Sequence, residues 1–120
     1  MAGVQLRDYQ YEALMKMRNG CILNGGVGVG KSRTSLAYYY ILNGGEVNTS
    51  TYVKMKAKPK DLYIITTALK RDKFEWESEL LNFHMNVDTS TSIYKHKIFI
   101  DSWNNIKKYI DVENAFFIFD

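Results

Sequence analysis

The sequence is poor in cysteine, in long apolar runs and in net charge. Its one cysteine, Cys21, cannot form an internal disulfide, which indicates a reducing, cytoplasmic setting, and we expect it to be a small core residue rather than a nucleophile. The longest apolar runs, such as AFFIF at residues 115–119, are too short to cross a bilayer. The first residues, MAGVQLRD, lack the basic and apolar blocks of a signal peptide. The net charge of +3 is too weak on its own to indicate nucleic-acid binding.

The overall composition is that of an ordinary soluble protein. The 120 residues are 46% hydrophobic and 24% charged, which is enough for one globular domain with a core and leaves no room for a second. We therefore expect residues 1–120 to form a single domain.

A glycine-rich stretch at residues 21–32, CILNGGVGVGKS, is the most informative part of the chain. It fits the pattern G-x-x-x-x-G-K-[ST] of a phosphate-binding loop, with the fixed places taken by Gly25, Gly30, Lys31 and Ser32. The alternative is a flexible glycine linker beside an ordinary lysine. It is disfavoured because chance places these residue types at the required offsets in only about one chain in several hundred of this length. No G-x-G-x-x-G register fits, which argues against a dinucleotide fingerprint.

The chemistry of a nucleoside triphosphate explains this spacing. Its oxygens need many donors in a small volume, and glycines let backbone amides approach the β-phosphate closely. A helix beginning near Lys31 would point its N–H groups and its dipole at the same oxygens. We expect Lys31 to reach the β- and γ-phosphates of ATP and the Ser32 hydroxyl to ligate Mg²⁺. The expected nucleotide contacts from this loop are Gly26, Gly28, Gly30, Lys31, Ser32 and Arg33.

Helical and extended patterns alternate along the chain. Apolar spacing predicts helices at residues 8–18, 31–42 and 70–83, and another marked by Trp103, Ile106 and Ile110. Apolar runs predict buried strands at residues 21–24, 61–66, 97–100 and 115–119, the last covered on both faces, and a polar edge strand within 85–94. This alternation implies an α/β fold with a parallel sheet and right-handed crossovers. Trp76 and Trp103 are expected to be core anchors rather than base-stacking platforms.

Lysine alternates with other residues in EVNTSTYVKMKAKPK, residues 46–60. In an extended strand four ammonium groups would share one side, those of Lys54, Lys56, Lys58 and Lys60. They could blunt an edge strand or hairpin against aggregation, or they could form a ribbon that contacts phosphates. Both interpretations stay open, and the salt dependence of DNA binding after Lys-to-Ala replacement would separate them.

Polar residues follow the ends of the predicted strands. The glycine loop, Thr67, Asp101 and Asp120 all map to the carboxyl edge of the sheet, where parallel sheets bind ligands. Asp120 directly follows the apolar strand at residues 115–119. We therefore expect it to act as a Walker B carboxylate that organises Mg²⁺ together with Ser32.

With these residues in place, the chain resembles the first RecA-like motor domain of superfamily 2 helicases and translocases over nearly its whole length. The resemblance implies a P-loop NTPase fold, a three-layer sandwich with a mostly parallel sheet. LRDYQ, residues 6–10, looks like that family's Q motif. Gln10 would then read adenine, because a glutamine amide can donate and accept at once along the N6 and N7 edge. The alternative is a solvated helical glutamine.

Two further stretches resemble helicase motifs more loosely. LYIITTALKRDKFEWESEL, residues 62–80, is similar to motif Ia and its helix, and IDSWNNIKKY, residues 100–109, looks like motif Ib. Small hydroxyls and amides at strand ends can bind phosphates without reading sequence. The nucleic-acid contacts implied by the resemblance are Thr66, Thr67, Lys70, Ser102 and Lys107. Ordinary helix capping by Thr67 or Ser102 is the alternative.

FFIFD, residues 116–120, fits the start of motif II, and here the sequence departs from the family. The family pattern places a glutamate, which orients the attacking water, directly after the aspartate, where the given sequence ends. A later strand and the second motor domain with its arginine fingers are also missing. We therefore expect an incomplete N-terminal part of the motor domain that binds nucleotide weakly and is inactive alone. Lys31 and Asp120 are the expected catalytic residues of the parent enzyme.

The leading expectation is an ATP-driven DNA helicase or translocase that acts on single-stranded or duplex DNA. DNA is preferred to RNA because the variants of motifs Ia and Ib look more like those of chromatin-remodelling and restriction-enzyme motors. One alternative is a viral DNA-packaging ATPase, which can share the P-loop and an adenine-reading glutamine. The other is a non-catalytic nucleotide-binding module.

Overall fold

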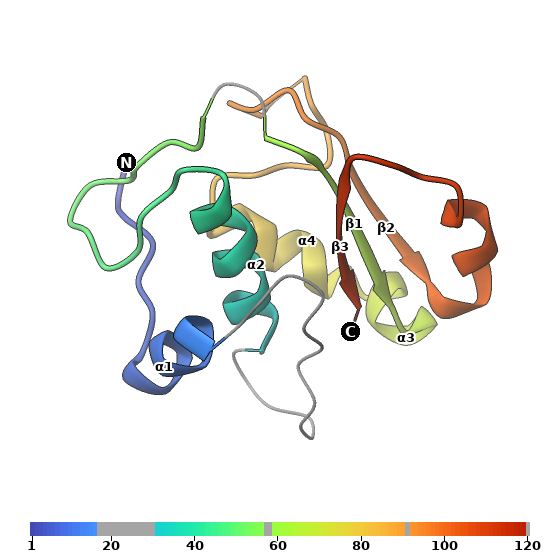
Figure 1. The fold of residues 1–120 in the computed structure, drawn as a ribbon, viewed down its shortest axis with the longest axis horizontal. Helices are drawn as coiled ribbons and strands as arrows, with labels where there is room; N and C mark the ends of the chain where they lie inside the picture. The colour runs from blue at the N-terminus through green and yellow to red at the C-terminus, as the bar shows by residue number, and fades with distance from the viewer. Residues whose placement is uncertain (17–30, 57–58, 91, 120) are drawn as a thin grey trace. The chain divides into compact units, whose positions relative to one another are not determined.

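The chain folds as two compact units in a computed structural model, Met1–Ala57 and Lys58–Asp120 (Figure 1). The structure describes residues 1–16, 31–56, 59–90 and 92–119, with the backbone alone at positions 13, 16 and 31. The expectation of a single domain stays a prediction. Among the described residues, no helix is both long enough and apolar enough to cross a membrane.

The N-terminal unit contains helices α1 (Asp8–Lys16) and α2 (Lys31–Leu42), which contact each other. The helix predicted at residues 31–42 is confirmed over 31–42, and the positions before it lie outside the described residues. The helix predicted at 8–18 is confirmed over 8–16, and its last two positions lie outside the described residues, as does the strand predicted at 21–24. Apolar residues of both helices are buried in the core, among them Leu14, Leu36 and Tyr40.

A glycine turn ends α2 and sets the direction of the following chain. Gly44 has a φ of 99°, a left-handed conformation that residues with a Cβ resist. The Gly44 amide donates to the Ile41 carbonyl at 3.0 Å, and the Gly45 amide donates to the Tyr40 carbonyl at 2.9 Å. This pair of bonds is a Schellman motif, which satisfies carbonyls that the helix end would otherwise leave without a donor.

Gly44→Ala is expected to destabilise the N-terminal unit by about 1 kcal/mol, because alanine resists the positive φ. Gly44→Asn is the matched control. Both variants place a Cβ 2.9 Å from the flexible Lys56 side chain, but asparagine tolerates the left-handed region better. Urea unfolding followed by far-UV circular dichroism measures both losses. Equal losses would assign the effect to the Lys56 contact rather than to φ.

Residues 46–56 form an irregular segment, so the predicted edge strand or hairpin is wrong for this stretch. Two isolated bridges tie it to the N-terminal residues, Ala2 with Thr51 and Val4 with Val47. The Tyr40 hydroxyl donates to the Val53 carbonyl, and the Tyr40 ring stacks on Tyr52 with 5.5 Å between centroids. Scattered backbone hydrogen bonds and these side-chain contacts therefore hold the segment, rather than a continuous ladder.

Lysine side chains in this segment still point to solvent on either side of a buried residue, although the segment is not a strand. Met55 is buried, while Lys54 and Lys56 on either side of it are exposed. Lys58 lies outside the described residues. Protection against aggregation and phosphate binding, the two roles considered for these lysines, both stay predictions.

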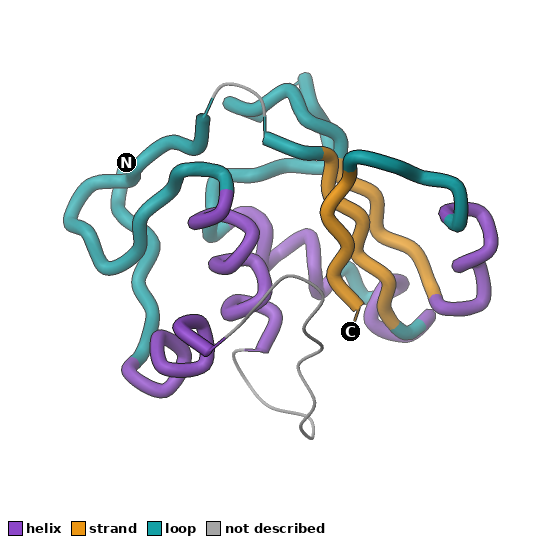
Figure 2. Tube along the Cα trace, in the orientation of Figure 1, coloured by secondary structure: helices purple, strands orange, loops and turns teal. Residues whose placement is uncertain are grey.

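The C-terminal unit is built on a parallel sheet of three strands, β1 (Asp61–Thr66), β2 (Ile98–Ser102) and β3 (Ala115–Phe119) (Figure 2). The strand order is β2-β1-β3, so β1 is central, and its apolar side chains Leu62, Ile64 and Ile65 are almost fully buried. The strands predicted from these apolar runs are confirmed, with the second placed slightly later in the sequence. The α/β class with a parallel sheet is therefore confirmed.

The register brings the carboxyl ends of the strands to one edge. Thr66 at the end of β1 pairs with Ser102 at the end of β2. Ile65 pairs with Asp101 on one side and with Phe119 on the other. The polar residues predicted at the ends of β1 and β2 therefore share an edge.

The single helix predicted at residues 70–83 is wrong. The structure has α3 (Ala68–Asp72) and α4 (Glu75–Leu81), with Phe74 between them at a φ of 57°. A left-handed residue cannot continue a right-handed helix, so the chain turns there before α4 begins. The apolar face predicted for this region is nevertheless buried, and it consists of Trp76, Leu80 and Phe83.

Two more segments differ from their predicted form. Residues 85–94 contain turns and bends and no described strand. The amphipathic helix predicted after β2 is a 3₁₀ helix, η1 (Trp103–Tyr109), with no buried residue. Because 3₁₀ geometry repeats every three residues, Trp103, Ile106 and Tyr109 share one side of it.

Candidate nucleotide and nucleic-acid site

The nucleotide site predicted from the glycine loop centres on the N-terminus of α2. Lys31 and Ser32 belong to this helix, as the motif requires of the residues that follow its glycines. Its first turn contains no acidic residue; Ser32 and Arg33 are half-buried, and Thr34 is buried. The N–H groups of a first helical turn and the helix dipole favour an anion at such a terminus. The other expected contacts lie outside the described residues: Gly25, Gly26, Gly28, Gly30 and the Lys31 side chain.

Gln10 is held by the start of α1. Its side chain is 5% exposed, and its Oε1 accepts a hydrogen bond from the Arg7 amide at 2.9 Å. This is the way in which the third residue of a helix satisfies the amide of the residue that caps it. The solvated glutamine considered as an alternative is therefore excluded, and adenine recognition by Gln10 stays a prediction.

The predicted magnesium ligands are not both described. Asp120 lies outside the described residues, directly after β3. Ser32 is in the first turn of α2. The pairing of Ser32 and Asp120 around Mg²⁺ stays a prediction.

Two of the predicted nucleic-acid contacts are at the start of α3. Thr67 is the N-cap residue, and its hydroxyl oxygen accepts a hydrogen bond from the Lys70 amide at 3.3 Å. Thr67 therefore performs the capping role considered as an alternative. Because the hydroxyl keeps its own proton to donate, capping and a phosphate contact are compatible. Thr67 is exposed, and Lys70 is half-buried.

Ser102, the contact expected from motif Ib, faces inward. It is 2% exposed, and its Oγ accepts from Arg71 Nη1 at 3.4 Å. The Arg71 side chain is 33% exposed. The group that this part of the edge presents to solvent is therefore the Arg71 guanidinium, which the sequence did not single out.

Asp101 is the centre of a hydrogen-bond network at the same edge. Its Oδ1 accepts from the Ser102 amide at 2.7 Å, from Asn105 Nδ2 at 2.8 Å and from Arg71 Nη1 at 3.2 Å. Its Oδ2 accepts from the Tyr109 hydroxyl at 2.6 Å. One carboxylate thus joins the end of β2 to α3 and to η1.

The electrostatics of this network give it a structural role. Burial opposes ionisation of Asp101, but the hydrogen bonds from Asn105, Tyr109, the Ser102 amide and Arg71 outweigh it and hold the pKa of Asp101 well below its usual range. Burial and the hydrogen bond to Asp101 raise the pKa of Tyr109 to about 12. Neither group changes its protonation near neutral pH. The pair therefore orients its neighbours and is unsuited to acid–base catalysis.

The two tryptophans have different environments. Trp76 is 2% exposed, as predicted for a core anchor. Trp103 is 44% exposed and stacks on Phe119 with 5.5 Å between centroids, so its prediction as a core anchor is wrong. The expectation that β3 is covered on both faces is also wrong, because Ile118 is its only buried residue. The short η1 helix leaves part of this sheet face open.

Each unit therefore carries part of the predicted chemistry, a helix terminus suited to an anion in one and a polar sheet edge in the other. Comparison of the chain with protein-family models, with curated proteins and with solved structures finds no match.

Proposed function

We propose that the chain is the ATP-binding part of an ATP-dependent DNA helicase or translocase of the superfamily 2 type, with a RecA-like P-loop NTPase fold. The observation that carries this proposal is that the residues from Lys31 onward, beginning with the Lys-Ser pair of the phosphate-loop motif, are helical. A flexible glycine linker gives no reason for a helix to follow the glycines. The parallel sheet of the C-terminal unit supports the same fold.

The residues at the start of α2 fit a magnesium-bound triphosphate. The first turn supplies Lys31, Ser32 and Arg33 and no carboxylate that would repel phosphate. When bound, ATP supplies the phosphoanhydride bond whose hydrolysis drives movement. Lys31 would offset the charge of the β- and γ-phosphates, and the Ser32 hydroxyl would ligate Mg²⁺; Asp120 is the second metal ligand that the sequence motif implies. Gln10, at the start of α1, is the proposed adenine contact.

The start of α3 is the proposed DNA contact. Thr67 and Lys70 lie there, and Arg71 is oriented by Asp101 at the same edge. Ser102 is buried and would act indirectly, because its hydroxyl oxygen accepts a hydrogen bond from the Arg71 guanidinium. A hydroxyl, an ammonium and a guanidinium can all bind phosphates without reading bases. This property suits a motor that moves along any sequence.

Lys31→Ala is expected to weaken binding of a fluorescent ATP analogue in Mg²⁺ by about tenfold or more, because it removes a charge-assisted contact to the phosphates. Lys95→Ala is the matched control, since Lys95 is an exposed lysine for which no phosphate contact is proposed. Equilibrium fluorescence titration measures both. Equal affinity of the wild type and Lys31→Ala would contradict the nucleotide site.

A second titration tests the motor. If ATP binding and DNA binding are coupled, adding single-stranded or duplex DNA changes the affinity for ATP, and ATP changes the affinity for DNA by the same factor. Nucleotide binding that is blind to DNA would favour the non-catalytic nucleotide-binding module instead. Absence of nucleotide binding would refute the proposed function.

A further inference from the structure

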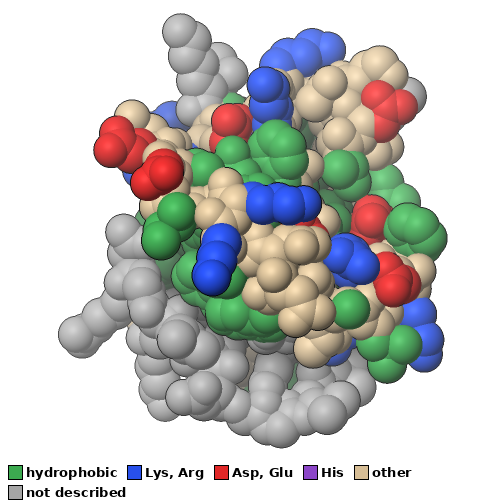
Figure 3. All heavy atoms as spheres, turned by 90° about the vertical axis from the view of Figure 1, so that its right-hand side faces the viewer, with side chains coloured by type: hydrophobic (Ala, Val, Ile, Leu, Met, Phe, Trp, Pro, Cys, Tyr) green, Lys and Arg blue, Asp and Glu red, His purple; other side chains and the backbone are tan. Residues whose placement is uncertain are grey.

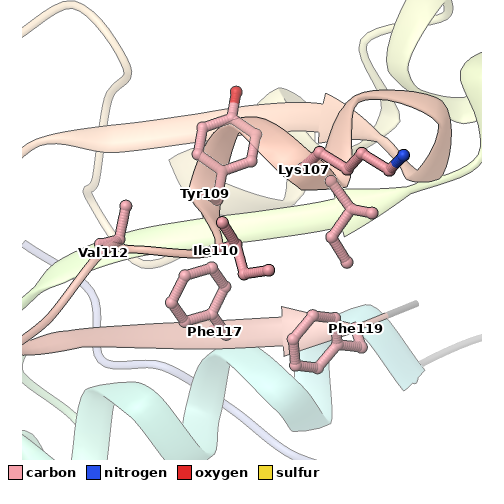
Figure 4. Close-up of a pocket in the computed structure, with 7 residues that line it drawn as sticks. Lys107, Tyr109, Ile110, Val112, Phe117 and Phe119 are labelled. Atoms are coloured by element: carbon pink, nitrogen blue, oxygen red, sulfur yellow. The ribbon is translucent and has the colours of Figure 1, made fainter.

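An apolar hollow of about 410 Å³ opens between η1 and β3 in the C-terminal unit (Figure 4). Its walls include the rings of Tyr109, Phe117 and Phe119 and the side chain of Ile110. Ile110 is 80% exposed and Phe119 is 37% exposed. The volume falls within the range of about 300–1,000 Å³ that is usual for small-ligand sites, which are also mostly apolar.

A row of stacked aromatic rings crosses the sheet and ends at this hollow. Tyr63 stacks on Phe99 at 4.8 Å and on Phe117 at 5.0 Å, and Phe117 stacks on Phe119 at 5.7 Å. Trp103 covers part of Phe119 and is itself 44% exposed. Flat rings are therefore already arranged in parallel where the hollow opens to solvent.

The two ends of the hollow differ in charge. Lys107 and Phe119 line the end toward the carboxyl edge of the sheet, and Val112 lines the opposite end (Figure 4). Val112 is flanked in sequence by the exposed acidic residues Asp111 and Glu113. On the side of the structure shown in Figure 3, basic and acidic side chains both lie among exposed hydrophobic ones. An anionic group attached to an occupant is therefore favoured at the Lys107 end.

The lining offers flat apolar contact and little hydrogen bonding. The Tyr109 hydroxyl, the polar group on its aromatic wall, already donates to Asp101 Oδ2 at 2.6 Å. A planar ring would therefore be held by stacking and not by recognition of its edge. Stacking is tolerant of sequence because every base has a π-face.

We propose that the hollow receives an unstacked base of single-stranded DNA, with Lys107 contacting a neighbouring phosphate. The inference rests on the proposed function and adds to it a base-stacking site on the motif Ib side of the sheet. The hollow has flat rings and one basic end, and its lining offers little hydrogen bonding to the edge of a base. These features suit a single strand that moves past the site whatever its sequence.

The test compares two fluorescein-labelled oligonucleotides of equal length and charge, oligothymidylate and its abasic counterpart, by fluorescence anisotropy. The wild-type chain is expected to bind oligothymidylate about tenfold more tightly, because base–aromatic stacking has this magnitude. Phe119→Leu keeps the apolar volume but removes the ring, so it is expected to abolish the preference and leave abasic binding unchanged. Leu81→Ala, at an exposed apolar residue of α4, is the control and is expected to keep the preference.

Lys107→Ala tests the phosphate contact. It is expected to reduce the slope of log affinity against log salt by about 0.7, the value for one phosphate of a single strand. Lys95→Ala is its control, because Lys95 is exposed and precedes the amino end of β2. An unchanged slope in Lys107→Ala would overturn the assignment of this lysine.

The possible failures are distinguishable. Equal binding of oligothymidylate and the abasic strand would overturn the base-stacking site and leave the proposed motor function intact. A base preference without ATP binding would refute the motor and leave the stacking site. Self-association of the chain that Phe119→Leu abolishes would assign the hollow to a second copy and overturn the proposal.

Discussion

Trp76→Ala is expected to destabilise the C-terminal unit by about 3–5 kcal/mol, the usual loss when a buried aromatic side chain is removed and a cavity remains. Trp76 is 2% exposed, near the start of α4, and shares its apolar face with Leu80 and Phe83, which are fully buried. Because small domains are stable by only about 5–15 kcal/mol, this is a large fraction of the total. Urea unfolding followed by far-UV circular dichroism measures the loss.

Trp103→Ala is the matched control, because it removes the same side chain from the same unit. Trp103 is 44% exposed and stacks on Phe119, so its removal leaves no buried cavity and a loss of about 1 kcal/mol or less is expected. Losses of similar size in the two variants would contradict the difference in burial.

Asp101→Asn is expected to destabilise the same unit by about 2 kcal/mol at neutral pH, because hydrogen bonds to a charged acceptor are stronger than those to a neutral one. Asparagine also presents an amide N–H₂ where one carboxylate oxygen accepted hydrogen bonds. Asp72→Asn is the matched control. Asp72 also pairs with Arg71, at 3.1 Å, but it is 66% exposed, so a loss of about 0.5 kcal/mol or less is expected.

The acid dependence of stability is a second readout of Asp101. Its pKa in the folded chain lies below the value of about 3.9 expected in the unfolded chain, so its contribution is complete above about pH 5. It is lost as the pH falls through about 4 toward the folded pKa. Asp101→Asn is therefore expected to flatten the acid limb of the stability curve. Tryptophan fluorescence in urea follows it, since Trp76 and Trp103 are both in this unit. An acid limb as steep in the variant as in the wild type would contradict the role of Asp101.

Much of the fold could be predicted because its signals are local. The apolar runs at 61–66 and 115–119 are strands with the predicted bounds, and the spacing after Lys31 correctly predicts α2. The parallel sheet followed from the alternation of these elements. The break at Phe74 could not be predicted, because no glycine or proline marks it.

The candidate site was predicted less completely. Asp101 could be placed at the carboxyl edge because it lies near the end of a strand. Its partners Asn105 and Tyr109 follow it by four and eight residues. This spacing is a local signal from which their contact with Asp101 could have been predicted. Arg71 could not be identified as a partner, because it comes from a different element far away in the sequence. Ser102 was predicted as a surface contact and is buried behind Arg71.

The sequence by itself determined that residues 61–66 and 115–119 are extended and that the residues following the glycine loop are helical. Both properties depend on side-chain periodicity and on backbone groups within a few residues. The tertiary structure alone decided that Trp76 is buried while Trp103 is exposed, and that Asp101 holds Arg71. Burial and ion pairing depend on which distant segments come to lie against a side chain, and that information is not contained in local spacing.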